Sequence, residues 1–188
     1  MYEDISLDLL KDKRLFQEIH QTKNFFIQLF SELANALPEE KLLKVHEKSK
    51  GKKISKGNEL EHCPYQVLDL VRDFDKKQGF NIRLLNWWGH GIFMLLYYGV
   101  ENIPDKPKYT SLVERGYEVT QTGSPWEYKQ IINDHRREAL PSMDRLNAHV
   151  NQYHHVQLIK PLPYHNNYQE LRQMLFEELN QVINFHLL

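Results

Sequence analysis

The sequence predicts an α+β fold, in which helices pack around one central antiparallel sheet. Segments near both ends of the chain carry apolar residues at helical spacing, and the middle holds three consecutive segments rich in strand-forming residues. Eight glycines and eight prolines in 188 residues are too few for a linker-rich chain, and no internal repeat divides it. We therefore expect a single domain over residues 1–188, with a strand meander at about 65–99 and added edge strands.

The first element is a helix predicted from Arg14 to Leu37. Its apolar residues recur at spacings of three, four and seven positions, which is typical of a helix with one buried face. They are Leu15, Ile19, Phe26, Phe30, Leu33 and Leu37. Pro38 ends the helix, because a proline pushes the preceding residue out of helical geometry. The apolar face is expected to pack on the protein's own sheet, although the same face could bind a partner.

Lysines crowd the segment that follows. Residues 41–56 contain seven lysines and a single acid, Glu47. Ser49 to Gly57 is predicted as a loop or an edge hairpin, where lysines also block unwanted strand pairing. The same lysines could contact phosphates, but the segment has no Tyr, Phe or Trp to stack on bases. A weak nucleic-acid binder acting through Lys41–Lys56 is therefore only the second alternative function, and nucleic acid is not an expected partner.

The central segments predict the meander itself. Tyr65 to Val71 and Phe80 to Trp88 are rich in strand formers and are separated by an Asp/Lys/Gly turn. Ile92 to Tyr98 follows after the short sequence Gly89-His90-Gly91, so a β-hairpin is expected there. This third run is apolar at every position, and we expect it at the centre of the sheet with both faces covered.

The segment 117–150 is predicted to hold a strand and a kinked helix pair. Tyr117 to Thr120 has the composition of a strand, and Ser124-Pro125-Trp126-Glu127 that of a helix start, with a serine cap and a proline in the first turn. The helix is expected to continue through Arg137 until Pro141 kinks it. A second helical segment then carries Met143, Leu146 and Val150.

A strand and a helix complete the chain. Val156 to Ile159 is predicted as an edge strand that Pro161 ends. The last helix is predicted from Tyr168 to about Phe185, with Asn167 in a capping position. Its apolar residues are Leu171, Leu175, Leu179, Val182 and Ile183.

Ten histidines raise the question of a metal site, and their spacing argues against one. Two helical ligands must lie one turn apart, whereas His149 and His154 are five residues apart. A composite site of His62, Cys63 and His90 stays open as the first alternative function, a metal-dependent or Cys/His enzyme. No Gly-x-Ser-x-Gly elbow, P-loop or dinucleotide fingerprint is present, so no catalytic residue, metal or cofactor is predicted.

The segment Asn81–Gly91 is the candidate binding region. On a strand, Arg83, Leu85 and Trp87 share one face, so a cation, an apolar floor and an aromatic plane coincide. This combination suits an anionic or aromatic ligand, and it equally suits a buried arginine stacked on tryptophan. The candidate ligand-binding residues are Arg83, Trp87, Asn86, Tyr65 and His90. Consecutive tryptophans face opposite sides of the sheet, and a one-residue shift in register exchanges the roles of Trp87 and Trp88.

Two stretches resemble a family of uncharacterised bacterial proteins. The first contains Ile54-Ser55-Lys56-Gly57 and Pro64-Tyr65-Gln66-Val67-Leu68-Asp69, and the second is Asn86-Trp87-Trp88-Gly89. The family is similar in its Pro-Tyr-x-x-Leu-Asp strand followed by a Trp-Trp-Gly turn, and the resemblance covers residues 54–99. It implies a shared α+β fold and an intracellular setting, and it implies no activity, cofactor or site residue.

Composition bounds the expected function. The 24 basic and 25 acidic side chains nearly cancel, no apolar run approaches bilayer length, and the first residues resemble no secretory signal. A single cysteine, Cys63, is consistent with a reducing compartment. We expect a cytoplasmic, non-catalytic protein that binds a small ligand or another protein, with a small ligand or a second copy as the partner and no membrane contact.

Overall fold

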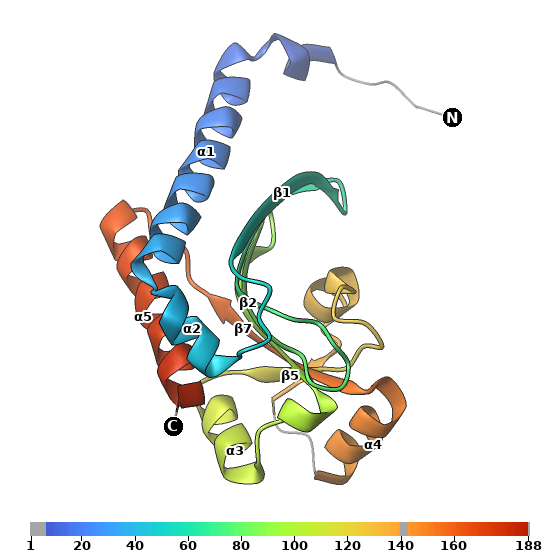
Figure 1. The fold of residues 1–188 in the computed structure, drawn as a ribbon. Coiled ribbons are helices and arrows are strands. Elements are labelled where there is room, and N and C mark those ends of the chain that lie inside the picture. Colours follow the sequence, from blue (N-terminus) through green and yellow to red (C-terminus); the bar gives the residue numbers. More distant parts are fainter. Residues whose placement is uncertain (1–6, 140–142, 188) are drawn as a thin grey trace.

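A computed structural model describes residues 7–139 and 143–187. Its described strands form one antiparallel sheet in the order β1-β2-β3-β4-β7-β5-β6 (Figure 1). The strands are β1 (Lys53–Leu60), β2 (Cys63–Arg72), β3 (Phe80–Trp87), β4 (Gly91–Gly99), β5 (Glu118–Thr120), β6 (Arg137–Glu138) and β7 (His155–Leu162). The predicted α+β class is confirmed.

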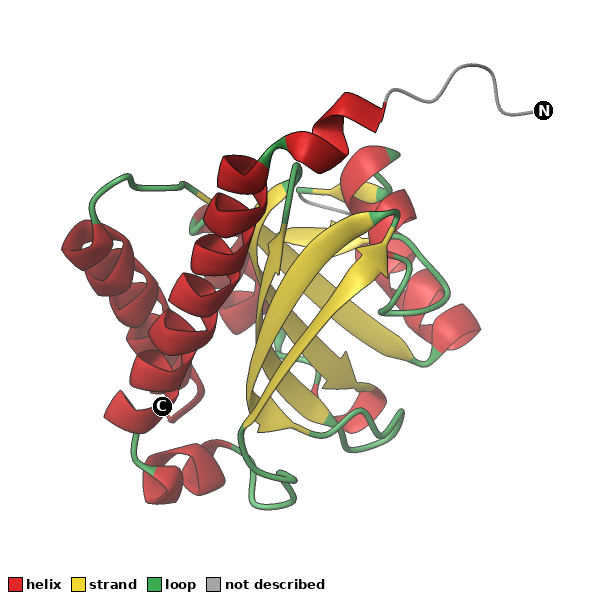
Figure 2. Cartoon of the chain, turned by 90° about the horizontal axis from the view of Figure 1, so that it is seen from above, coloured by secondary structure: helices red, strands yellow, loops and turns green. Residues whose placement is uncertain are grey.

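The long helices α1 and α5 pack on one face of the sheet, and the segment 128–133 packs on part of the other face (Figure 2). The helices are α1 (Lys13–Ala36), α2 (Glu39–Val45), α3 (Lys106–Glu114), α4 (Met143–Tyr153) and α5 (Tyr168–Leu187), with the short turns η1 (Leu7–Lys11), η2 (Val100–Asn102) and η3 (Lys129–Asn133). The larger core cluster lies between α1, α5 and the sheet, and the smaller cluster lies under η3.

The predicted meander is confirmed as β2, β3 and β4. Trp87 pairs with Tyr65 on one side and with Gly91 on the other, which fixes the register of all three strands. A three-residue turn joins β3 to β4, and its middle residue, Gly89, has a φ of +78°, a conformation that favours glycine. The residues Ile92 to Gly99 of β4 are all buried, as expected for a central strand.

The stretch Ser49–Gly57, predicted as a loop or an edge hairpin, is a loop up to Lys52 and then enters β1, the edge strand of a hairpin. β1 pairs with β2 alone, and the connecting residues Glu61 and His62 both have positive φ. Two-residue turns of this kind match the twist of the flanking strands. Two of the lysines, Lys53 and Lys56, are exposed on this edge strand, where they discourage pairing with another sheet.

Both long terminal helices are confirmed. In α1 the side chain of Asp12 caps the first turn, and the buried residues lie in the C-terminal half. Lys52 closes the other end, where its Nζ donates to the carbonyls of Ala34 and Leu37 at 2.9 and 2.6 Å. In α5 all five predicted apolar residues are buried, and Asn167 Oδ1 accepts the amides of Gln169 and Glu170.

The predicted kinked helix pair is wrong in its first half. Glu127 does reach back to the Ser124 amide, at 3.1 Å, but the helix that follows is a single π-helical turn, η3. Residues Arg137–Glu138 then pair with β5 as strand β6, so the chain gains sheet hydrogen bonds in place of further helix. The second half is confirmed as α4, and the predicted kink at Pro141 lies outside the described residues.

The predicted edge position of the Val156–Ile159 strand is also wrong. The observed strand, β7, lies between β4 and β5. Only Leu158 and Ile159 pair with β5. The first residue of β5, Glu118, lies opposite Ile159, so no residue of β5 lies opposite Pro161. The proline is therefore tolerated inside β7, because the strand beyond β5 has a neighbour on one side only. Within the described parts of the chain, no helix has the length and apolar character needed to cross a bilayer.

Candidate ligand-binding site

The alternation of side chains along β3 separates the candidate residues onto two faces. Leu85 and Trp87 belong to the smaller core cluster, and half-buried Tyr65 packs against it. Ile82 and Leu84 belong to the larger cluster beneath the helices. The structure therefore does not bring Arg83, Trp87 and Tyr65 together with Asn86, which lies on the helix-covered face.

Arg83 is a buried structural residue with its charge neutralised. Its Nε and Nη2 donate to the two carboxylate oxygens of Asp69 at 2.7 and 3.0 Å, and its Nη1 donates to the Tyr128 hydroxyl. The guanidinium also lies over the rings of Phe74 and Trp126, at 5.1 and 4.5 Å from their centroids. Asp69 and Arg83 are thus paired across β2 and β3, and the tryptophan under the guanidinium is Trp126 rather than Trp87.

Trp87 is fully buried, and His90 covers it. The two rings stack at 3.6 Å, while the indole Nε1 of Trp87 donates to the Leu60 carbonyl at 3.0 Å. His90 Nδ1 is hydrogen-bonded to the Trp88 carbonyl at 3.0 Å. These bonds fix the β3–β4 turn against β1 and leave the Trp87 ring no surface for a ligand.

Asn86 and Trp88 lie on the opposite face and form a polar network there. Asn86 Nδ2 and Trp88 Nε1 both donate to the Gln66 Oε1, at 2.7 and 2.9 Å. The Tyr164 hydroxyl donates to Asn86 Oδ1 at 2.7 Å. Desolvation raises the pKa of Tyr164 to about 12, so its hydroxyl stays protonated and remains a donor. Asn86 is wholly buried, and this network fixes the orientation of its amide.

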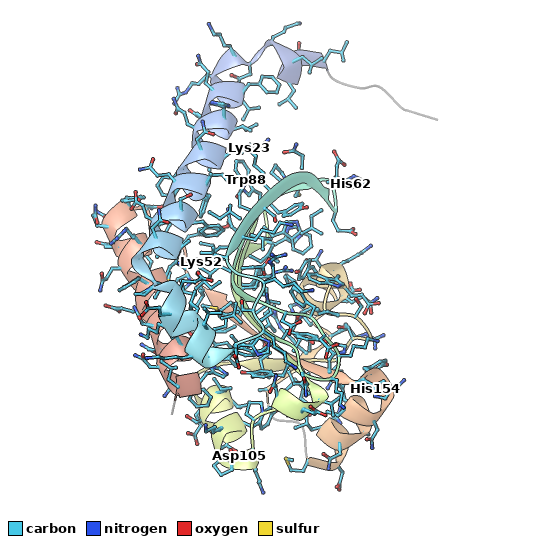
Figure 3. All side chains as sticks on the ribbon, in the orientation of Figure 1. Lys23, Lys52, His62, Trp88, Asp105 and His154 are labelled. Carbon is cyan, nitrogen blue, oxygen red and sulfur yellow. The ribbon has the colours of Figure 1, made fainter. Side chains whose placement is uncertain are left out.

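A cavity of about 830 Å³ opens beside this network. It lies where α1, the β3–β4 turn and the segment between β7 and α5 meet, and Figure 3 shows Trp88 on the side of the sheet next to α1. We call it the Trp88 cavity. Its described lining is Gln21, Thr22, Phe25, Phe26, Asn86, Trp88, Gly89, Tyr164, His165, Asn166 and Leu171.

The lining combines an aromatic wall with a small polar floor. Phe26 meets Tyr164 edge to face at 6.4 Å and Phe25 at 5.2 Å, so aromatic rings surround the space. The buried amide of Asn86 supplies the polar group at the floor. Pockets of 300–1,000 Å³ with apolar walls and a few placed polar groups are typical of small-molecule sites.

The composite enzyme site has no support as a metal centre. His62 is exposed at the tip of the β1–β2 hairpin (Figure 3), His90 is stacked on Trp87, and Cys63 packs against the smaller core cluster. In residues 7–139 and 143–187, no group of three or more His, Cys, Asp or Glu is arranged to hold a metal ion.

The lysine segment is spread over three elements. Lys41 lies on α2 and donates to Asn180, Lys52 closes α1, and Lys48 donates to Gln78. These contacts tie the segment to the body of the protein, so three of its seven lysines have structural partners.

Comparison of the chain with known protein families, with curated proteins and with solved structures gives no match. The candidate site therefore stands on its geometry.

Sequence reasoning missed most of the cavity lining. Asn86 was identified, and Phe26 was assigned to the apolar stripe of the first helix. Tyr164 and Asn166 lie in a segment between a strand and a helix with no recognisable motif. Phe25 stands one position off the predicted stripe, and its ring meets those of Phe26 and Tyr168 edge to face.

Proposed function

We propose that this protein is a non-catalytic binding protein for a small, planar, largely apolar molecule that enters the Trp88 cavity. The observation that carries the proposal is the aromatic cavity of about 830 Å³ with a buried, hydrogen-bonded amide at its floor. Burying apolar ligand surface in such a space supplies about 25 cal/mol per Å² of driving force. A planar molecule suits the edges and faces of the surrounding rings.

The polar groups at the floor of the Trp88 cavity favour a ligand with a hydrogen-bonding group. Asn86 is wholly buried, so the group of this network that a ligand reaches is the Tyr164 hydroxyl, which donates to Asn86 Oδ1 and can still accept a hydrogen bond. A ligand with a single hydroxyl group joins this network, whereas a ligand without one leaves it unchanged. We infer that the ligand carries one such group on an otherwise apolar frame.

The lining favours binding over catalysis. Nucleophilic catalysis needs a hydroxyl or thiol next to a base. The Thr22 hydroxyl donates to the Glu18 carbonyl, one turn earlier in α1, and His165 lies 3.7 Å from Glu170. Among the described lining residues these groups are engaged separately, and no nucleophile–base pair is formed.

The test is calorimetric titration with 2-naphthol, a planar apolar molecule with one hydroxyl. Thr22→Phe adds a ring to the lining of the cavity and is expected to weaken binding at least tenfold, because the ring occupies space that the ligand needs. Thr110→Phe is the matched control: Thr110 on α3 makes the same hydroxyl bond to the carbonyl four residues earlier, but it does not line the cavity. It is expected to bind 2-naphthol within twofold of wild type.

Fluorescence gives an independent readout. Trp88 lines the cavity, whereas Trp126 is 47% exposed on the opposite face. In a Trp126→Phe background, a planar probe that does not absorb where tryptophan is excited, such as benzyl alcohol, is expected to shift the emission. Trp87 also emits, but it is fully buried in the smaller core cluster, so the shift reports on Trp88. Unchanged emission together with equal 2-naphthol binding by Thr22→Phe and wild type would show that the cavity is not the binding site.

We also propose a reducing, cytoplasmic setting. Cys63 is the only cysteine of the chain, and half-buried among the residues of the smaller core cluster it acts as a small apolar side chain.

A further inference from the structure

A second cavity, of about 330 Å³, lies between β5, the residue before β6, and α4. Its described lining is Val119, Gln121, Arg136, Arg145, Leu146, Ala148, His149, Gln152 and Tyr153. Two arginines and a histidine belong to this set, and no acidic side chain among the described residues lines the space. We call it the α4 cavity. Its lining is rich in cationic and hydrogen-bond-donating side chains, in contrast to the apolar Trp88 cavity, and the Glu138 carboxylate beside it pairs with Arg145 at 2.7 Å.

The backbone and one carboxylate position these donors. The Gln121 amide donates to the Arg136 carbonyl at 2.7 Å, which extends the β5–β6 pairing and brings Arg136 to the rim of the cavity. Glu138 accepts Gln121 Nε2 with one carboxylate oxygen and Arg145 Nη1, at 2.7 Å, with the other. Both side chains are thus oriented before any ligand arrives.

His149 provides an independent sign that the cavity takes a ligand. It lies one turn after Arg145 on α4, so the two side chains project from the same face of the helix. Its Nε2 is buried and has no hydrogen-bond partner within residues 7–139 and 143–187. Buried polar atoms are almost always paired in folded proteins, so an unpaired one at a cavity wall points to a missing partner.

We propose that the α4 cavity binds a tetrahedral oxyanion, such as a phosphate group, through Arg136, Arg145 and His149. Arginine forks make short, charge-assisted hydrogen bonds to such oxygens, and a ring N–H from His149 adds a donor from a third direction. A planar carboxylate needs only one fork, whereas a tetrahedral anion uses donors that converge from several elements. The site is separate from the Trp88 cavity and does not depend on the function proposed for it.

Titration calorimetry with inorganic phosphate at constant ionic strength tests the proposal. Wild type is expected to show saturable binding, and Arg136→Gln is expected to weaken it at least tenfold. Arg136 is exposed, so its substitution leaves the core unchanged. Arg14→Gln, which removes the same charge from an exposed site at the start of α1, is expected to bind phosphate within twofold of wild type.

A second measurement reports on the cavity directly. In a ¹⁵N spectrum of the histidine rings, phosphate is expected to shift the His149 resonances and to leave those of exposed His62 unchanged. Sulfate is expected to reproduce the shift and acetate is not. Absence of saturable binding, an equal loss in Arg14→Gln and Arg136→Gln, or acetate binding as tight as phosphate would overturn the assignment.

Discussion

At the scale of single residues, burial decides what each polar group can do. Arg83 and Asp69 are both nearly inaccessible, and each satisfies the other, so the pair holds β2 to β3 instead of receiving a ligand. Asn86, three residues further along β3, is just as buried but lies at the floor of a cavity. The candidate site predicted from the sequence includes both Arg83 and Asn86. Residue type and position on a strand can be predicted from the sequence, but not which side chains from other elements pack against each of them.

Removing one partner of the Arg83–Asp69 pair is expected to destabilise the protein strongly. Arg83→Ala leaves the Asp69 carboxylate buried without its counter-charge, and such losses cost about 3–5 kcal/mol. Urea unfolding followed by circular dichroism measures the difference. The double variant Arg83→Met with Asp69→Leu is the control, since replacing both charges by apolar groups is often neutral. An Arg83→Ala protein as stable as wild type would contradict the structural role.

His186 is expected to make stability fall on acidification. It is hydrogen-bonded to the Tyr98 hydroxyl and to the Val182 carbonyl, and burial lowers its pKa to about 4. In the unfolded chain a histidine has a pKa near 6.5. Between pH 4 and 6.5 the unfolded state therefore binds more protons than the folded state, so the free energy of unfolding falls as the pH drops from about 6.5 towards 4. At pH 5 the loss amounts to about 2 kcal/mol, at 1.36 kcal/mol per unit of pH below 6.5.

The measurement is the urea midpoint at pH 7 and at pH 5. His155 is also buried and His149 is half-buried, and desolvation lowers the pKa of each, so they add to the same trend. His186→Gln is therefore expected to reduce the pH dependence without abolishing it. A variant with the same pH dependence as wild type would show that His186 does not contribute.

At the scale of elements, the spacing of apolar residues predicts a helix or strand correctly where those same residues are buried in the structure. The α5 stripe and the β4 run are examples, because both are buried as their spacing requires. The segment after Ser124 is the counterexample. Its capping signals are satisfied, yet pairing of Arg137 and Glu138 with β5 competes with helix and wins. A local signal cannot report a partner strand that lies almost twenty residues earlier in the chain.

The C-terminal half of α1 and the turn η1 before it are expected to differ in their contribution to stability. Leu33 is fully buried against the sheet, so Leu33→Ala is expected to cost about 2–5 kcal/mol. Leu10, in the turn before α1, is 67% exposed, and Leu10→Ala is expected to change stability by less than about 0.5 kcal/mol. Thermal unfolding of the two variants makes the comparison. Similar losses of stability in the two variants would contradict the prediction and would mean that Leu10 is buried in solution.

At the scale of the whole molecule, the fold class follows from pattern, and the site follows from packing. Helical spacing at the ends and strand patterning in the middle suffice to predict helices on an antiparallel sheet. The Trp88 cavity is formed by side chains from α1, the β3–β4 turn and the segment before α5, which are separated by more than sixty residues along the chain. No local pattern encodes how closely three such elements approach one another.

The position of the Trp88 cavity along α1 has a consequence for how a ligand enters. Thr22 and Phe25 immediately precede the buried residues of α1, which begin at Phe26. The N-terminal part of the helix extends beyond the sheet (Figure 1). Helix ends open far more often than helix centres, so unwinding that begins at the N-terminal side of α1 removes the wall formed by Thr22 and Phe25 and leaves the sheet intact. An occupant bridging α1 to Trp88 would oppose that unwinding. Slower amide hydrogen exchange in the turns before Phe25 is then the signature of an occupied protein.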